Sequence, residues 1–379
     1  MTTLVIEKSD AYGTHCRIDY RRHTGHFMAG ATKVGFELVA PSDRARGLPC
    51  VVVEAAHFNG KPLGRDVYLR ADQLCCRGFR HAWIPDVRHA TAANLARLAR
   101  ALRTQLRQVQ GPIQKVYGVG FSASAAVLEE VLAAPDQAGV FDASLVGTSP
   151  STLVPPAAAG KVIRFNAEAD FLSVFAAGGR ALLDRAAAAQ HLRWYVATGG
   201  PHLPDARFTR NVPVGPCGPP NGTTPLNWTP IARAAFWAAD EWARLGTAPP
   251  ANHLPVVDAA SGEIARDGRG HARGGVRLPS LVLAEARFEA RAATSCGDLF
   301  GSYSSPRSIG SPGFPATPQA YVAAFREAAQ KLVDRRLMTP GDAAWLTRQA
   351  VRAAAVPCTY TQLYAEERDR ADILEEAEA

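Results

Sequence analysis

The sequence contains no stretch of eighteen uninterrupted apolar residues, and residues 1–13 lack the apolar core of a signal peptide. A membrane-spanning helix needs about 20 such residues, so we expect neither membrane insertion nor export. Seven cysteines form an odd set with irregular spacing. In a chain of this length they favour reduced thiols and a cytoplasmic location, with a Cys217–Cys296 bridge as the alternative for an exported chain.

Patterns typical of metal and nucleic-acid binding are also missing. There is no CxxC pair and no HExxH motif, so the spacing of ligands predicts no metal, and we expect no cofactor. The formal net charge is +7, but no run of five basic residues occurs and no aromatic and basic stripe accompanies the charge. We interpret it as general surface charge and expect neither a nucleic-acid nor a membrane partner.

Between Pro49 and Val196 the sequence alternates short apolar runs with helical stretches. Continuous apolar strands separated by helices predict an α/β fold, with a mostly parallel central sheet flanked by helices on both faces. The expected strands are residues 50–56, 79–84, 115–121, 144–146, 162–165 and 192–196, and the expected helices are residues 92–109, 123–133 and 179–190.

The character of the sequence changes after His202. Residues 211–230 are rich in Pro, Gly and Thr, and helical patterns follow at 229–245, 316–330 and 339–354. We expect residues 1–210 to form the α/β core. Residues 211–379 are expected to form cap-like loops and C-terminal helices that pack on the same core, which makes a single structural domain the expectation.

The stretch Gly120-Phe-Ser122-Ala-Ser124 carries the clearest chemical signal. A strand is expected to end on Gly120 and a helix to begin directly after Ser122, which is the setting of the G-x-S-x-G nucleophile elbow. The last position is Ser124 rather than Gly, so the match is incomplete. The N-terminus of the helix would direct partial positive charge to the place where an oxyanion develops.

A nucleophilic serine needs a base and an acid, and hydrolases of this kind carry them in the order Ser, acid, His. Glu168 and Asp170 follow the strand at 162–165, and His202 lies in a Gly-Gly-Pro loop that follows the strand at 192–196. We predict His202 as the base and prefer Asp170 as the acid, with Glu168 as its competitor.

The second oxyanion donor is expected from the loop after an earlier strand. Here that loop follows the strand at 50–56, and its backbone N–H groups would act together with that of Ala123. Its residues are His57, Phe58, Asn59 and Gly60.

A competing interpretation is a dinucleotide-binding fingerprint, because Gly118-Val-Gly120-Phe-Ser-Ala123 also fits G-x-G-x-x-A. That motif requires an acidic residue at the end of the next strand, for the ribose hydroxyls. The next strand here, at 142–150, has its Asp at the beginning and none at the end, so a nucleotide cofactor is disfavoured.

With these residues in place, the chain resembles a broad family of bacterial α/β-hydrolase-domain proteins, mostly uncharacterised and considered serine esterases. The likeness runs from about Cys50 onward and includes the Gly-Phe-Ser-Ala-Ser elbow, the Asn-Ala-Glu-Ala-Asp segment ending at Asp170, Thr198-Gly-Gly-Pro-His202 and Gly274-Gly-Val-Arg-Leu-Pro279. The resemblance implies Ser122, His202 and an acid at Glu168 or Asp170. It fixes neither the substrate nor the compartment.

These observations predict a serine hydrolase that cleaves a carboxylic ester, or a related acyl bond, in a small molecule. Two alternatives stay open: an acyltransferase that uses the same triad, and a hydrolase-like protein that binds without chemistry. Residues 211–228 and the C-terminal helices are expected to cover the site, with Trp228, Phe300, Tyr303 and Phe314 as candidate walls and Arg277 as a candidate lining residue. The sequence does not indicate which oligomeric state the protein adopts.

Overall fold

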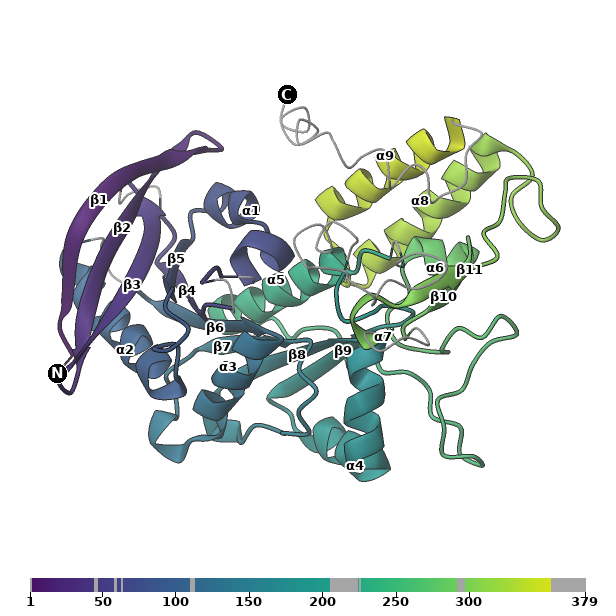
Figure 1. The fold of residues 1–379 in the computed structure, drawn as a ribbon. Helices are drawn as coiled ribbons and strands as arrows, with labels where there is room; N and C mark the ends of the chain where they lie inside the picture. The colour runs from purple at the N-terminus through teal and green to yellow at the C-terminus, as the bar shows by residue number, and fades with distance from the viewer. Residues whose placement is uncertain are drawn as a thin grey trace. The chain divides into compact units, whose positions relative to one another are not determined.

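The computed structural model describes residues 2–43, 47–57, 60–62, 64–109, 113–204, 224, 226–291 and 297–355. Contacts divide the chain into two compact units, which are described separately. The first comprises Met1–Phe165, Val174–Tyr195 and Ala232–Asn252, and the second comprises Asn166–Ser173, Val196–Ile231 and His253–Ala379. Figure 1 labels the helices and strands along the chain.

A nine-stranded sheet, in the order β1-β2-β3-β5-β4-β6-β7-β8-β9, is the framework of the first unit. Strands β5, β4, β6, β7 and β8 pair in parallel, whereas β1, β2 and β3 pair antiparallel with their neighbours. The predicted sheet flanked by helices is therefore confirmed. The strands are β1 (Leu4–His15), β2 (Ile18–Ala29), β3 (Thr32–Pro41), β4 (Cys50–Ala55), β5 (Arg80–Ile84), β6 (Lys115–Phe121), β7 (Ala143–Gly147), β8 (Lys161–Ala167) and β9 (Leu192–Ala197).

Alternation along β6 shows how helices cover both faces of this sheet. A Cβ added to Gly118 would lie 2.7 Å from Leu128, so this face packs closely on α3 (Ala123–Ala133). The preceding residue, Tyr117, points the other way, and its hydroxyl donates to Asp240 of α5 (Thr229–Leu245) at 2.7 Å. In Figure 1, α2 (Ala92–Val109) and α3 accordingly lie on one side of the sheet and α5 on the other. Such two-sided burial explains why the strands are almost uniformly apolar.

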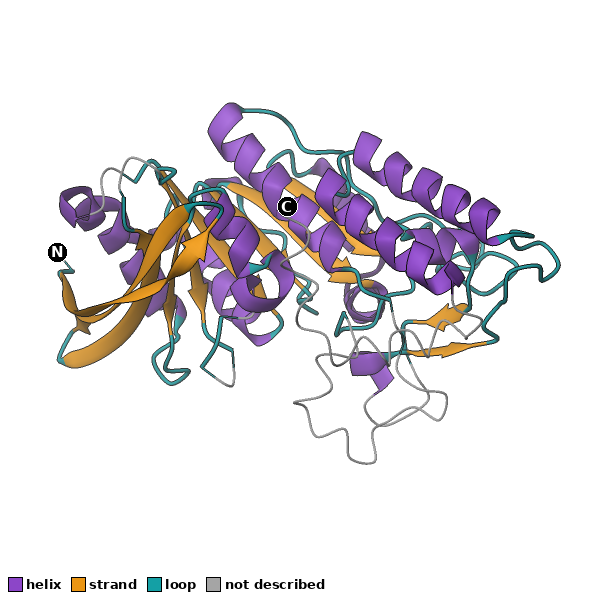
Figure 2. Ribbon diagram, turned by 90° about the horizontal axis from the view of Figure 1, so that it is seen from above, coloured by secondary structure: helices purple, strands orange, loops and turns teal. Residues whose placement is uncertain are grey.

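Several shorter or bent elements complete the chain, and Figure 2 distinguishes helices, strands and loops. The helix predicted at 179–190 is the second half of α4 (Glu168–Ala188), which begins eleven residues earlier and bends at Gly179, where φ is 56°. The remaining helices are η2 (Gly64–Leu69), α1 (Ala71–Cys76), η3 (Pro135–Gln137), η4 (Ala157–Ala159), α6 (Pro279–Leu283), α7 (Gly297–Phe300), α8 (Pro318–Asp334) and α9 (Pro340–Ala355). No described helix is long and apolar enough to span a membrane.

The second unit combines a small hairpin with helices. Strands β10 (Arg287–Glu289) and β11 (Ser302–Ser304) pair antiparallel, and α8 packs against both α6 and α9. Residues 255–274 form isolated bridges that pair Pro255 with Gly274, Val257 with Ile264, and Arg266 with Ala272.

The expectation that all cysteines are reduced is wrong for one pair. Cys16, in the turn between β1 and β2, and Cys76, at the end of α1, form a disulfide, with their Cα atoms 5.0 Å apart. Sixty residues separate them in sequence, so no local spacing rule could have revealed the pair. The cytoplasmic expectation rested on reduced thiols and loses that support. Cys50 and Cys75 are buried and do not take part in a disulfide, whereas Cys217, Cys296 and Cys358 lie outside the described residues.

Replacing Cys16 with serine should lower the free energy of unfolding by about 4 kcal/mol, because a crosslink that closes a loop of this length restricts the unfolded chain. Denaturant unfolding of the oxidised protein would measure the loss. The control is the natural protein with its disulfide reduced, which should unfold at the same denaturant concentration as the Cys16→Ser variant. Alkylation of both Cys16 and Cys76 in the native, unreduced protein would contradict the prediction.

Candidate active site

Ser122 lies between the end of β6 and the first residue of α3, as the sequence predicts. Its backbone has φ 54° and ψ −121°, a left-handed conformation that a non-glycine residue rarely adopts. The side chain is only partly buried. A strained serine at a sharp turn from strand to helix is the defining geometry of a nucleophile elbow.

Two small residues permit this turn. A Cβ on Gly120 would lie 2.6 Å from the carbonyl oxygen of Ser124, so only glycine fits there. Ser124 stands where the motif has its second glycine, and its buried hydroxyl is fully used. Its Oγ accepts from the Phe121 N–H at 2.9 Å and donates to the Phe121 carbonyl at 3.0 Å. The departure from G-x-S-x-G therefore supplies a side-chain clamp on the elbow.

Replacing Ser124 with alanine should destabilise the protein by about 1–3 kcal/mol, since the buried Phe121 N–H then loses its acceptor. Ser122 keeps its place, so the reaction of the protein with a serine-directed phosphonate should persist. Thermal unfolding and labelling of the same preparation would measure both effects. A Ser124→Ala variant that is stable but unreactive would identify Ser124 as the nucleophile.

A second strained residue supports the elbow from β7. The Ser122 N–H donates to the Gly147 carbonyl and to Thr148 Oγ1, both at 3.1 Å. Thr148 is fully buried and has φ 47°, which is rare for a β-branched residue. Two adjoining strained residues indicate a backbone held in place for function. The sequence offered no signal for Thr148, because its role depends on where β7 ends.

In the second unit, His202 pairs with Asp170. The His202 Nδ1 lies 2.6 Å from Asp170 Oδ1, and the two side chains are 14% and 6% exposed. The other carboxylate oxygen of Asp170 accepts from the Ala167 N–H at 3.2 Å. Asp170 sits in the first turn of α4, where the helix dipole favours a negative charge. The preference for Asp170 over Glu168 as the partner of His202 agrees with this geometry.

Glu168 instead holds the loop that carries His202. Its Oε2 accepts from the Gly199 N–H at 2.6 Å. The neighbouring Ala169 N–H donates to the Gly200 carbonyl at 3.1 Å. Trp228, expected as a pocket wall, is buried and donates through Nε1 to the Pro201 carbonyl at 2.8 Å. Three successive residues before His202 are therefore each fixed by a hydrogen bond.

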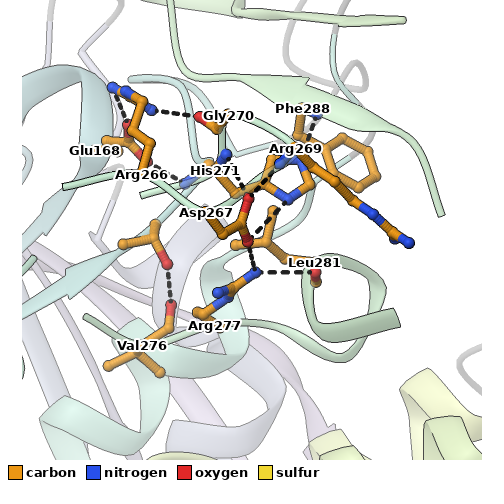
Figure 3. A network of polar contacts seen from close by, with 12 residues as sticks. Glu168, Arg266, Asp267, Arg269, Gly270, His271, Val276, Arg277, Leu281 and Phe288 are labelled. Atoms are coloured by element: carbon orange, nitrogen blue, oxygen red, sulfur yellow. Dashed lines mark hydrogen bonds and ion pairs between the residues drawn. The ribbon is translucent and has the colours of Figure 1, made fainter. Parts of the chain in front are cut away.

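Arg266 neutralises the buried Glu168 carboxylate, as Figure 3 shows. Its guanidinium donates to Glu168 Oε1 at 3.0 Å and to the Gly270 carbonyl at 2.9 Å. The Glu168 side chain is 2% exposed, so an unpaired charge there would carry a large desolvation cost. Sequence reasoning missed Arg266, because it lies about a hundred residues from its partner in an irregular segment.

Two of the four N–H groups in the predicted oxyanion loop are engaged within the loop itself. The His57 N–H donates to the Lys61 carbonyl at 2.9 Å, and the Gly60 N–H donates to the His57 carbonyl at 2.8 Å. These two N–H groups therefore close a turn and are not available to a substrate oxygen. Phe58 and Asn59 lie outside the described residues.

Ala123 is better placed for this task. As the first residue of α3 it has an N–H for which the helix provides no carbonyl, and the residue is partly exposed. The helix dipole adds positive potential at the same point. Among the described residues, no group of three His, Cys, Asp or Glu side chains could hold a metal ion.

The comparisons with known proteins identify the family. A family model described as an alpha/beta hydrolase domain matches residues 85–348, and the chain belongs to this family. The match confirms the expected fold class and family, while the bacterial origin stays a prediction. A search of curated proteins found no match.

Similar solved structures include several esterases, all at TM-scores below 0.5. A juvenile hormone esterase from Manduca sexta is 15% identical with a TM-score of 0.24, over 30% of this chain and only 24% of its own length. Esterase B from Lactobacillus rhamnosis is 14% identical with a TM-score of 0.33, over 47% of this chain and 73% of its own. A cold-adapted esterase from an Arctic intertidal metagenomic library is 13% identical with a TM-score of 0.34, over 47% of this chain and 84% of its own.

Proposed function

We propose that the protein is a serine hydrolase that cleaves a carboxylic ester, or a related acyl bond, in a small molecule. The observation that carries the proposal is the strained, partly exposed Ser122 at the head of α3. The His202–Asp170 pair and the membership in the hydrolase family support it. Ser122, His202 and Asp170 would be the nucleophile, the general base and the acid.

The contacts of the imidazole define the proton transfers. Because Nδ1 faces a carboxylate, the proton resides on Nδ1, and Nε2 is left to accept the proton of Ser122. Ser122 Oγ then attacks the carbonyl carbon, and the Ala123 N–H stabilises the oxyanion. The intermediate collapses to an acyl-enzyme, and the leaving alcohol takes its proton from His202. Water, deprotonated by His202, attacks the acyl-enzyme, and the bond between the acyl group and Ser122 Oγ then breaks as Oγ takes that proton from His202 and the carboxylic acid leaves.

A fluorophosphonate probe tests this proposal directly. The probe should form a covalent adduct on Ser122, located by mass spectrometry of peptides, and the adduct should disappear in the His202→Ala variant. Hydrolysis of p-nitrophenyl esters, with and without an added alcohol, would separate hydrolysis from acyl transfer. Failure of the folded protein to react would favour a hydrolase-like binding protein instead.

A further inference from the structure

A cavity of about 800 Å³ lies within the second unit, beside the network drawn in Figure 3. Its polar lining includes Asp267, Arg269 and Arg277, and its apolar lining includes Val282, Leu283 and Pro315. This volume falls in the range of pockets that hold small molecules, and the mixture of charge and hydrocarbon suits an amphipathic ligand.

The single carboxylate in this lining is already occupied. Asp267 Oδ2 accepts from the Arg277 guanidinium at 2.9 Å, and Oδ1 accepts from the N–H groups of Arg269 and His271 at 3.0 and 3.1 Å. Burial acts to raise the pKa of Asp267, but these hydrogen bonds outweigh it and hold the pKa below its ordinary value. The Asp267 charge is therefore permanent and engaged with its own donors.

The arginines around the cavity exceed this one negative charge. The Arg269 side chain extends away from Asp267 in Figure 3, and no described residue forms an ion pair with it. Arg307 flanks the cavity, where its guanidinium stacks 5.0 Å from the Phe314 ring and lies 3.6 Å from where a Gly313 Cβ would be. Burial, followed by the nearby positive charge of Arg269, lowers the pKa of Arg307. Positive charges thus converge here without an equal number of partners.

The guanidinium of Arg269 is the accessible one in this lining. Arg269 is exposed, whereas Arg277 is partly buried and donates to Asp267. A planar guanidinium binds a carboxylate through parallel hydrogen bonds, so Arg269 suits a carboxylate head group.

The cavity also offers an apolar surface. Val282 is 53% exposed and lines the cavity. Leu283 and Pro315 extend the same wall. We propose that this cavity binds an organic monocarboxylate, with its head group on Arg269 and Arg277 and its hydrocarbon part on Val282, Leu283 and Pro315. The proposal does not depend on the chemistry of Ser122.

Isothermal titration calorimetry of the full chain with sodium octanoate tests this site. We expect saturable binding that weakens by roughly tenfold or more in Arg269→Ala, because a charge-assisted hydrogen bond is lost. Arg326→Ala removes the same charge from the exposed face of α8 and should leave the affinity unchanged. Val282→Asp, at an exposed position, should also weaken binding, since it places a carboxylate beside the ligand chain.

Two further probes separate the chemistry of the head group from that of the chain. Octanol has the chain without the charge, and sulfate has charge without the chain, so each should bind more weakly than octanoate. The proposal is overturned if octanoate does not saturate, or if Arg269→Ala and Arg326→Ala bind it equally. It is also overturned if octanol or sulfate binds as tightly as octanoate. Because binding is the only readout, inactivity of Ser122 would not affect the result.

Discussion

Replacing Ser122 with alanine should lower kcat for ester hydrolysis by a factor on the order of 10⁴–10⁶, because the acyl-enzyme can no longer form. Alanine has the same Cβ as serine, so it can occupy the same strained backbone at modest cost. The expected result is therefore a folded but inactive protein. Steady-state hydrolysis of p-nitrophenyl butyrate, corrected for the spontaneous rate, measures the loss.

The matched control is Ser124→Ala, two residues further along the chain in the first turn of α3. It removes the same hydroxyl group from a buried residue and should reduce stability far more than kcat. The pair of variants thus separates a chemical role from a structural one. If Ser122→Ala retained more than about a tenth of the activity while folded, the acyl-enzyme mechanism proposed here would be wrong.

Where a local pattern determines an element, the sequence predicted it well. The bounds of α2, β6 and α3 agree with the predicted ranges, because each has a strong periodicity and clear ends. The elbow followed from the same logic, since Gly120 and Ser122 have to lie between a buried strand and a helix. The fold class was predictable because continuous apolar strands alternate with helices.

The N-terminal strands escaped prediction for a physical reason. Most residues of β1 are exposed, so the strand has little of the apolar and polar alternation by which strands are recognised. Its stability comes from pairing with β2 across a two-residue turn and from the Cys16–Cys76 link, and the partner in that link lies 60 residues away in sequence. The contacts of Arg266 and Trp228 were hidden for the same reason.

The choice between the two acids shows where sequence stops and geometry is needed. Glu168 and Asp170 lie two residues apart at the start of α4. Both come directly after β8, so their positions in the sequence do not decide which one is the acid. They point to different partners: Asp170 to the His202 ring, and Glu168 to the Gly199 N–H and Arg266. One carboxylate can therefore orient the base, while the other supports the loop on which the base is carried.

Asp170→Asn should consequently lower kcat by about 10³–10⁴-fold. The new amide would donate to Nδ1, so the imidazole proton would move to Nε2, and His202 could not accept the Ser122 proton. Glu168→Gln keeps an oxygen that can accept from Gly199 and leaves the tautomer of His202 unchanged. Its loss should stay within about tenfold, with a fall in stability because the Arg266 ion pair is removed.

Measuring kcat, thermal stability and the rate of phosphonate labelling on both variants decides between these roles. The expected pattern is a folded, slowly labelled Asp170→Asn protein and a less stable, readily labelled Glu168→Gln protein. Equal losses of kcat in two folded variants would show that both carboxylates act on the base. A larger loss in a folded Glu168→Gln protein would reverse the assignment and make Asp170 the structural residue.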